Sequence, residues 1–69
     1  MQRVIVRNPA VLSGEPVFRG TRVPFKALTD YLEGGESIDQ FLEQYPSVTR
    51  GAVIAALEEA RESLLTSLK

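Results

Sequence analysis

The chain has 69 residues, a length that suits one small domain and leaves little room for a hydrophobic core. Hydrophobic residues make up 43% and charged residues 25%, a mixture typical of a globular protein and not of a disordered one. There is no cysteine and no histidine, which excludes disulfides, thiol chemistry, ordinary zinc sites and imidazole acid–base catalysis. We therefore expect a protein that is not an enzyme, with no catalytic residues, no metal site and no cofactor.

The net charge of −1 hides a strong difference between the two halves of the chain. Residues 1–28 hold five basic residues and only Glu15 as an acid (net +4), whereas residues 29–69 hold three basic and eight acidic residues (net −5). This asymmetry indicates a basic arm on an acidic body, suited either to head-to-tail self-association or to contact with phosphates or an acidic partner. No apolar run approaches the ~18 residues of a membrane span, and no signal peptide is apparent. We expect a cytoplasmic protein without membrane contact.

The residue pattern of the first third of the chain predicts β structure. Residues 2–7 contain three consecutive β-branched residues, which favour a strand, and Asn8-Pro9 ends it. Residues 17–23 predict a small hairpin that turns at Arg19-Gly20, where glycine permits a positive φ. The strand at residues 2–7 is expected to lack a partner within the chain, so pairing with the same strand of a second copy, through Val4 and Val6, would form a homodimer.

Three helices are expected in the remainder. Residues 25–33 follow Pro24 and stop at Gly34-Gly35, and residues 38–45 follow a capping box formed by Ser37 and Gln40. A third helix begins after Thr49 and continues to residue 69, with Glu58, Glu59 and Glu62 expected to face water. The fold class is therefore mainly α, a single domain over residues 1–69. A β arm and hairpin (residues 1–23) precede a three-helix, homeodomain-like helix-turn-helix core with a long C-terminal helix (residues 24–69).

The start of the third helix is the first candidate site. Its unpaired N–H groups and helix dipole favour a phosphate, the hydroxyls of Ser47 and Thr49 lie beside them, and Arg50 can contact a phosphate or a guanine edge. Arg19 and Arg22 of the arm would add phosphate contacts. Alternatively, Thr49 is only a cap, Arg50 only a solvated charge, and Gly20 between the arginines only a turn residue.

The end of the third helix is a candidate partner surface. Leu64, Leu65 and Leu68 lie beyond the reach of the two shorter helices, and leucines left in water imply a partner. That partner would be a second copy or another protein. In the alternative, the N-terminal strands fold over this end and complete the core.

Several motifs also resemble a known bacterial family. Asn8-Pro9, residues 14–16 and the segment Phe18-Arg19-Gly20-Thr21-Arg22-Val23-Pro24 are followed by Ser37-Ile38, Phe41-Leu42, Tyr45-Pro46, Thr49, Val53 and Ala56-Leu57. Their order, over about residues 4–60, is similar to that of the domain of unknown function 433 family, small proteins regarded as VapB-type antitoxins with short N-terminal strands on a homeodomain-like core. The resemblance implies an antitoxin that binds its own promoter as a dimer and neutralises a PIN-like ribonuclease toxin.

Two functional hypotheses follow. In the first, which we favour, the chain is a DNA-binding antitoxin that also binds its toxin. In the second, it is a protein-interaction module without DNA binding, and its acidic half masks a basic RNA-binding cleft on a ribonuclease.

Overall fold

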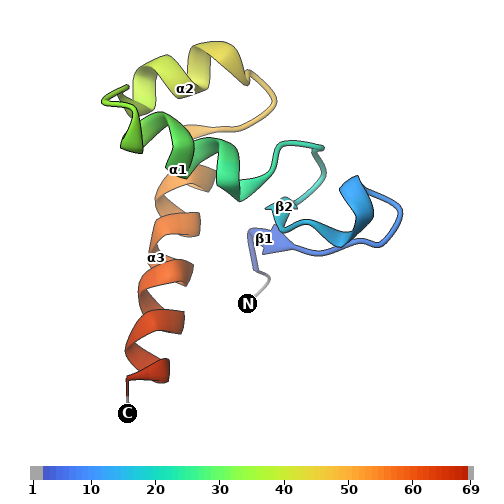
Figure 1. Cartoon of the computed structure of the whole chain (residues 1–69). Helices are drawn as coiled ribbons and strands as arrows, with labels where there is room; N and C mark the ends of the chain where they lie inside the picture. The colour runs from blue at the N-terminus through green and yellow to red at the C-terminus, as the bar shows by residue number, and fades with distance from the viewer. Residues whose placement is uncertain (1–2, 69) are drawn as a thin grey trace.

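The computed structural model describes residues 3–68 and places three helices together with a small β arm on one side (Figure 1). The chain order is β1 (Ile5–Val6), a 3₁₀ turn η1 (Leu12–Gly14), β2 (Val17–Phe18), α1 (Phe25–Glu33), α2 (Ile38–Gln44) and α3 (Arg50–Ser67). This order confirms the predicted fold class, a short β hairpin followed by three helices.

The helices begin at the capping residues that the sequence indicates. The Ser37 hydroxyl accepts the Gln40 N–H at 3.1 Å, and the Gln40 side chain accepts the Ser37 N–H at 2.7 Å, which completes the predicted capping box of α2. The Thr49 hydroxyl accepts the Ala52 N–H at 3.0 Å at the start of α3. Each cap satisfies backbone donors that have no partner within the helix.

The arm differs from the sequence prediction in its strand pairing. β1 and β2 are antiparallel neighbours, with Ile5 opposite Phe18 and Val6 opposite Val17, so the expectation that the first strand has no partner within the chain is wrong. The predicted turn is present: the Thr21 N–H donates to the Phe18 carbonyl at 3.0 Å, and Gly20 adopts a φ of 76°. After the turn the chain returns to β2 only through a single bridge between Val17 and Pro24.

The core lies between the arm and the three helices. An aromatic cluster occupies its centre, in which Phe41 is fully buried and its ring centroid lies 6.1 Å from that of Phe18 and 5.0 Å from that of Tyr45. Because Phe18 belongs to β2, the arm contributes directly to the core and is not a loose extension. The buried residues of the hydrophobic core as a whole are Phe18, Val23, Leu28, Phe41, Val48, Val53 and Ala56.

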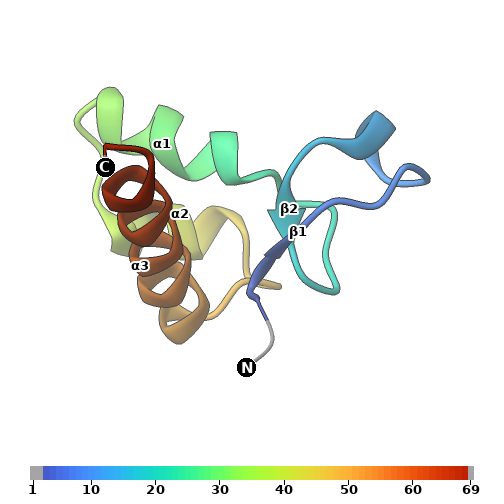
Figure 2. The ribbon, with the colours of Figure 1, turned by 90° about the horizontal axis from the view of Figure 1, so that it is seen from below.

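α3 extends well past the core. α1 and α2 lie beside its N-terminal part, while its C-terminal part projects alone (Figures 1 and 2). Every residue from Ala60 to Leu68 is exposed. The helix ends at Ser67, and the predicted end at Lys69 lies outside the described residues. None of the helices in residues 3–68 combines the length and the apolar character needed to cross a membrane.

Candidate functional site

The start of α3 presents the three residues that the sequence singles out there. Ser47, Thr49 and Arg50 are all exposed, and Gly51 leaves the first turn open on its outer side. They are positioned by the connection between α2 and α3, in which Val48 is buried and its N–H donates to the Tyr45 carbonyl at 3.0 Å. The short α2, this connection and α3 therefore have the outline of a helix-turn-helix.

Arg50 is not free at this site. Its guanidinium donates to the carboxylate of Asp39, which lies in the first turn of α2. Both side chains are more than half exposed, so the ion pair is a surface contact of small net energy. A phosphate or a base edge can bind Arg50 only by replacing or sharing this carboxylate. No pattern in the sequence indicates the pair, because the two residues are 11 positions apart and belong to different helices.

The arm carries the second group of candidate residues. Arg19 and Arg22 are exposed, as are Arg3 and Arg7, which flank β1. The Arg19 guanidinium donates to the main-chain carbonyl of Arg3, which ties the turn to the first strand.

None of these four arginines forms a salt bridge with a carboxylate of the described residues. Within residues 3–68 the salt bridges join Arg50 to Asp39 and Lys26 to Asp30. The hydrogen bond and charge of Asp30 raise the pKa of Lys26, so the last cation of the basic half is already engaged. The structure thus brings Arg3, Arg7, Arg19 and Arg22 into one small arm, in which Glu15 is the one acidic residue, so residues 3–23 carry a net charge of +3.

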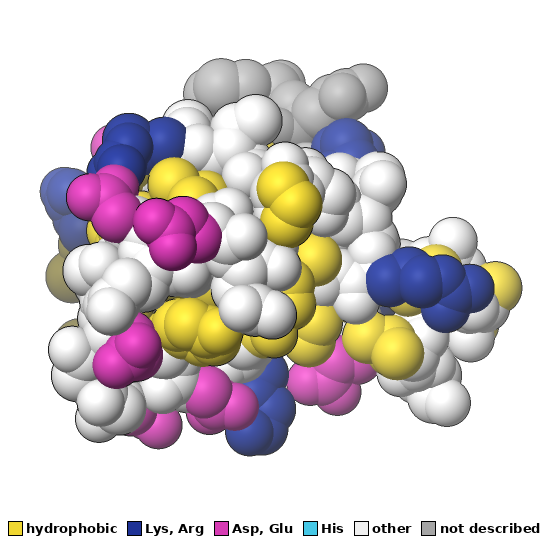
Figure 3. Space-filling view, turned by 90° about the horizontal axis from the view of Figure 1, so that it is seen from above, with side chains coloured by type: hydrophobic (Ala, Val, Ile, Leu, Met, Phe, Trp, Pro, Cys, Tyr) yellow, Lys and Arg dark blue, Asp and Glu magenta, His cyan; other side chains and the backbone are white. Residues whose placement is uncertain are grey.

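Charge is separated across the molecule. Figure 3 shows most of the acidic side chains of the upper face on the α1 and α2 side, with Lys and Arg side chains among them, and a basic group on the arm. The helical hairpin supplies Glu33, Glu36 and Glu43, all exposed. The asymmetry between the halves of the sequence therefore becomes an asymmetry between two sides of the fold.

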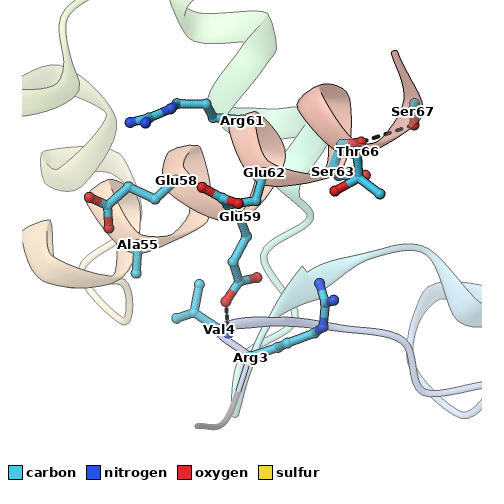
Figure 4. Close-up of a pocket in the computed structure, with 10 residues that line it drawn as sticks. All are labelled: Arg3, Val4, Ala55, Glu58, Glu59, Arg61, Glu62, Ser63, Thr66 and Ser67. Atoms are coloured by element: carbon cyan, nitrogen blue, oxygen red, sulfur yellow. Dashed lines mark hydrogen bonds between the residues drawn. The ribbon is translucent and has the colours of Figure 1, made fainter. Parts of the chain in front are cut away.

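Glu59 connects the arm to α3, a role that sequence reasoning missed. Its carboxylate accepts the Val4 N–H at 2.5 Å and the Ile5 N–H at 3.1 Å (Figure 4). The prediction that Glu59 faces water like Glu58 and Glu62 is therefore wrong, and its side chain is half-buried. No sequence signal distinguishes it, because the three carboxylates look alike until the strand is placed beside the helix.

This contact also bears on the predicted strand-to-strand dimer. Val4 and Val6 are half-buried, and Val4 packs against the core. The Ile5 N–H is occupied by Glu59, while the Val4 carbonyl accepts the Arg19 N–H at 2.8 Å. The unpaired backbone groups on which that dimer was argued are thus satisfied within the chain. A homodimer remains a prediction, but it needs another surface.

An open groove of about 980 Å³ lies between the arm and α3 (Figure 4). Arg3 and Val4 line one side, and Glu58, Glu62 and Thr66 are among the residues on the other. None of the described residues is a buried polar or charged one. The groove is therefore a shallow surface feature and not an enclosed polar site.

The three leucines predicted to bind a partner are exposed on the projecting end of α3. Leu64, Leu65 and Leu68 retain 60%, 51% and 73% of their exposable surface. The arm contacts α3 at Glu59, one turn or more before these leucines, and does not fold over them. The alternative in which the strands complete the core at this end is therefore wrong.

Comparison with known proteins finds a matching family, a similar solved structure and a related sequence. Residues 5–60 match the family described as "Protein of unknown function (DUF433)". A crystal structure of a DUF433 member protein from Anabaena variabilis ATCC 29413 is similar, with a TM-score of 0.77 and 28% identity over 94% of this chain and 64% of that chain. The uncharacterized protein y4eO of Sinorhizobium fredii (strain NBRC 101917 / NGR234) is 36% identical over 47 residues, which are 68% of this chain. The chain spans about a fifth of y4eO and under two thirds of the crystallised protein.

Proposed function

This chain belongs to the DUF433 family, whose description assigns no function. We propose from its surface that it binds DNA, and from the family resemblance of its motifs that it does so as the antitoxin of a toxin–antitoxin pair. The observation that carries the proposal is the net positive charge of the arm. Its four exposed arginines have no carboxylate partner within residues 3–68, and phosphates are the ligands that such a surface recognises.

The position of the arm supports the proposal further. In homeodomain-type recognition, an N-terminal arm with arginines enters the minor groove while the last helix of a three-helix core reads the major groove. Here a basic N-terminal arm is fastened to α3 by Glu59, and the first turn of α3 presents Thr49, Arg50 and Gly51. Glu58 and Glu62 would repel phosphates, so DNA contact is limited to the first turns of the helix.

At the start of α3, the Asp39 carboxylate competes with DNA for the Arg50 guanidinium. This carboxylate holds Arg50 in the free protein, and DNA must replace it or share Arg50 with it. Asp39→Asn should therefore strengthen binding, because it removes both the competitor and a negative charge beside the phosphates. Arg50→Ala should weaken binding by about 1–3 kcal/mol where Arg50 contacts a base. Asp39→Asn binding more weakly than wild type would show that the pair positions Arg50 and does not compete with DNA.

The experiment that tests the proposal is a salt titration of DNA binding. Fluorescence anisotropy is measured on a duplex with the sequence upstream of the chain's own gene and on an unrelated duplex of equal length. Each phosphate contact contributes about −0.9 to the slope of log affinity against log salt. Arg22→Gln should therefore make the slope shallower by about 1, whereas Lys26→Gln, which removes the same charge from α1, should not. No binding at low salt, or an equal effect of both variants, overturns the proposal.

A second candidate function is favoured by the acidic side of the fold. Glu33, Glu36 and Glu43 are exposed on the α1 and α2 hairpin and are suited to cover a basic RNA-binding cleft on a PIN-like ribonuclease. Co-expression with the product of the adjacent gene tests it. Glu33→Gln with Glu43→Gln should slow association and reduce inhibition of the ribonuclease, whereas unchanged inhibition would exclude this surface.

A further inference from the structure

The projecting end of α3 carries a largely apolar stripe, and nothing in the described chain covers it beyond Leu57. Leu57, Arg61, Leu64 and Leu68 follow a four–three–four spacing, which places them on one face of the helix as the a and d positions of a short coiled coil. Leu57 is half-buried against the core, while the other three are exposed. Glu59 and the arm lie on the opposite face, and Figure 4 shows Arg61 pointing away from the strand that Glu59 holds.

We infer that this stripe binds the same stripe of a second copy, so that the two projecting ends overlap as an antiparallel helix pair. Leu57 of each copy then packs beside Leu68 of the other, and Arg61 beside Leu64. The two-fold axis passes between Arg61 and Leu64, and one self-complementary interface covers the exposed leucines of both stripes.

Charge favours a second copy over a different partner. From residue 58 onward the sequence carries Glu58, Glu59 and Glu62 against Arg61 and Lys69, a net charge of only −1. The Glu59 carboxylate is held by the arm on the opposite face of the helix. A surface with so little net charge docks on its own copy with little repulsion, whereas a strongly basic ribonuclease or the phosphates of DNA find little attraction there. Arg61 also decides the orientation. In a parallel pair the two arginines would face each other, and in the antiparallel pair each lies against a leucine and extends its head to water.

The lengths of the parts agree with this arrangement. α1 and α2 cover α3 only along its N-terminal part, so a partner helix can advance along the stripe until it meets them (Figure 1). In the antiparallel pair, Leu68 of one copy reaches the level of Leu57 of the other, where the free surface ends. A chain with such a small core also gains stability from pairing.

The arrangement bears on the proposed function without resting on it. Arg50 lies about 12.5 residues from the two-fold axis, so the two α3 starts would be about 37 Å apart at 1.5 Å per residue. Helix-turn-helix dimers place their recognition helices about 34–36 Å apart, one turn of DNA. If the dimer binds an operator, its two half-sites are therefore expected to lie one turn of the DNA helix apart.

Sedimentation velocity in the absence of DNA tests the inference, since failure of DNA binding then leaves it unaffected. The wild type should sediment with twice the 7.6 kDa chain mass at high micromolar concentration. Leu64→Glu with Leu68→Glu should be monomeric, with the helical circular dichroism of the wild type. The matched control, Ser63→Glu with Thr66→Glu, adds the same charge to the same helix end on another face and should stay dimeric.

The orientation has its own test, because the natural chain contains no cysteine. Leu57→Cys and Leu68→Cys proteins are mixed and oxidised, and a mixed disulfide should form in preference to either homotypic one. A monomeric wild type, a dimer that survives the two glutamates, or loss of the fold in that variant but not in the control each overturns the inference. Preferential linkage of two Leu68→Cys chains to each other overturns the antiparallel arrangement.

Discussion

Glu59 differs from its neighbours on α3 in what its carboxylate touches. It accepts two main-chain N–H groups of the arm, at Val4 and Ile5, and so takes the place that a further strand would have at the edge of β1. An exposed strand edge is a site for unwanted pairing between chains, and a charged side chain that occupies it prevents this. A single residue of the long helix thus both fastens the arm and protects its edge.

Removal of this carboxylate should weaken the fold measurably. Glu59→Ala leaves two half-buried N–H groups without their acceptor, so we expect the free energy of unfolding to fall by about 1–2 kcal/mol in urea denaturation. Glu62→Ala, on the same helix but without such contacts, should change it by less than about 0.5 kcal/mol. Equal effects of the two substitutions would contradict the role assigned to Glu59.

Gly20 is required for its backbone conformation and not for space. Its φ is 76°, while a Cβ added there would meet nothing within 4 Å. Gly20→Ala should therefore cost about 1 kcal/mol of stability, and Gly20→Asn clearly less, because asparagine tolerates positive φ better. Thermal denaturation of the two variants measures the difference. If alanine proves as harmless as asparagine, backbone strain is not the reason for glycine at this turn.

Among the elements, α2 owes its starting point to the capping box. α2 has only seven residues, so the two hydrogen bonds between Ser37 and Gln40 satisfy a large share of its free N–H groups. Ser37→Ala should lower the free energy of unfolding by about 1 kcal/mol. Ser47→Ala is the control, since that exposed hydroxyl makes no hydrogen bond within residues 3–68, and denaturant titration should place it close to the wild type. A Ser47 variant as unstable as the Ser37 variant would contradict this account.

α3 combines two environments in one continuous helix. Val53 and Ala56 are buried in the core, whereas every residue from Ala60 to Leu68 is exposed. The helix is uniform in backbone structure, but only its N-terminal part is held by tertiary contacts. We therefore expect amide exchange to be slower before Ala60 than after it in a monomeric variant.

The stability of the molecule as a whole depends on one small aromatic core. Phe41 is fully buried and contacts the rings of Phe18, Tyr31 and Tyr45. Phe41→Ala should cost about 3–5 kcal/mol, which is comparable with all that a core of this size supplies, so the variant should be unfolded by circular dichroism. Leu32→Ala, at a side chain that is 38% exposed, should remain folded. A folded Phe41→Ala protein would show that stability resides elsewhere.

The local elements of this protein could be predicted from its sequence. The bounds of the helices follow from capping residues and breakers a few positions apart, such as Ser37 with Gln40, and Gly34 after α1. The turn at Gly20 and the exposed leucines at the end of α3 were predictable for the same reason. Caps, breakers and helical spacing act over one or two turns of chain, and that range is visible in a sequence.

Which distant groups meet could not be predicted in this way and became clear only from the folded chain. The pairing of β1 with β2, the contact of Glu59 with a strand more than 50 positions earlier, and the capture of Arg50 by Asp39 all join separate elements. Glu59, and not Glu58 or Glu62, accepts hydrogen bonds from the arm because the arm lies beside that face of α3. Such contacts follow from the packing of the core as a whole, because similar side chains have the same local propensities until the fold places one of them next to a partner.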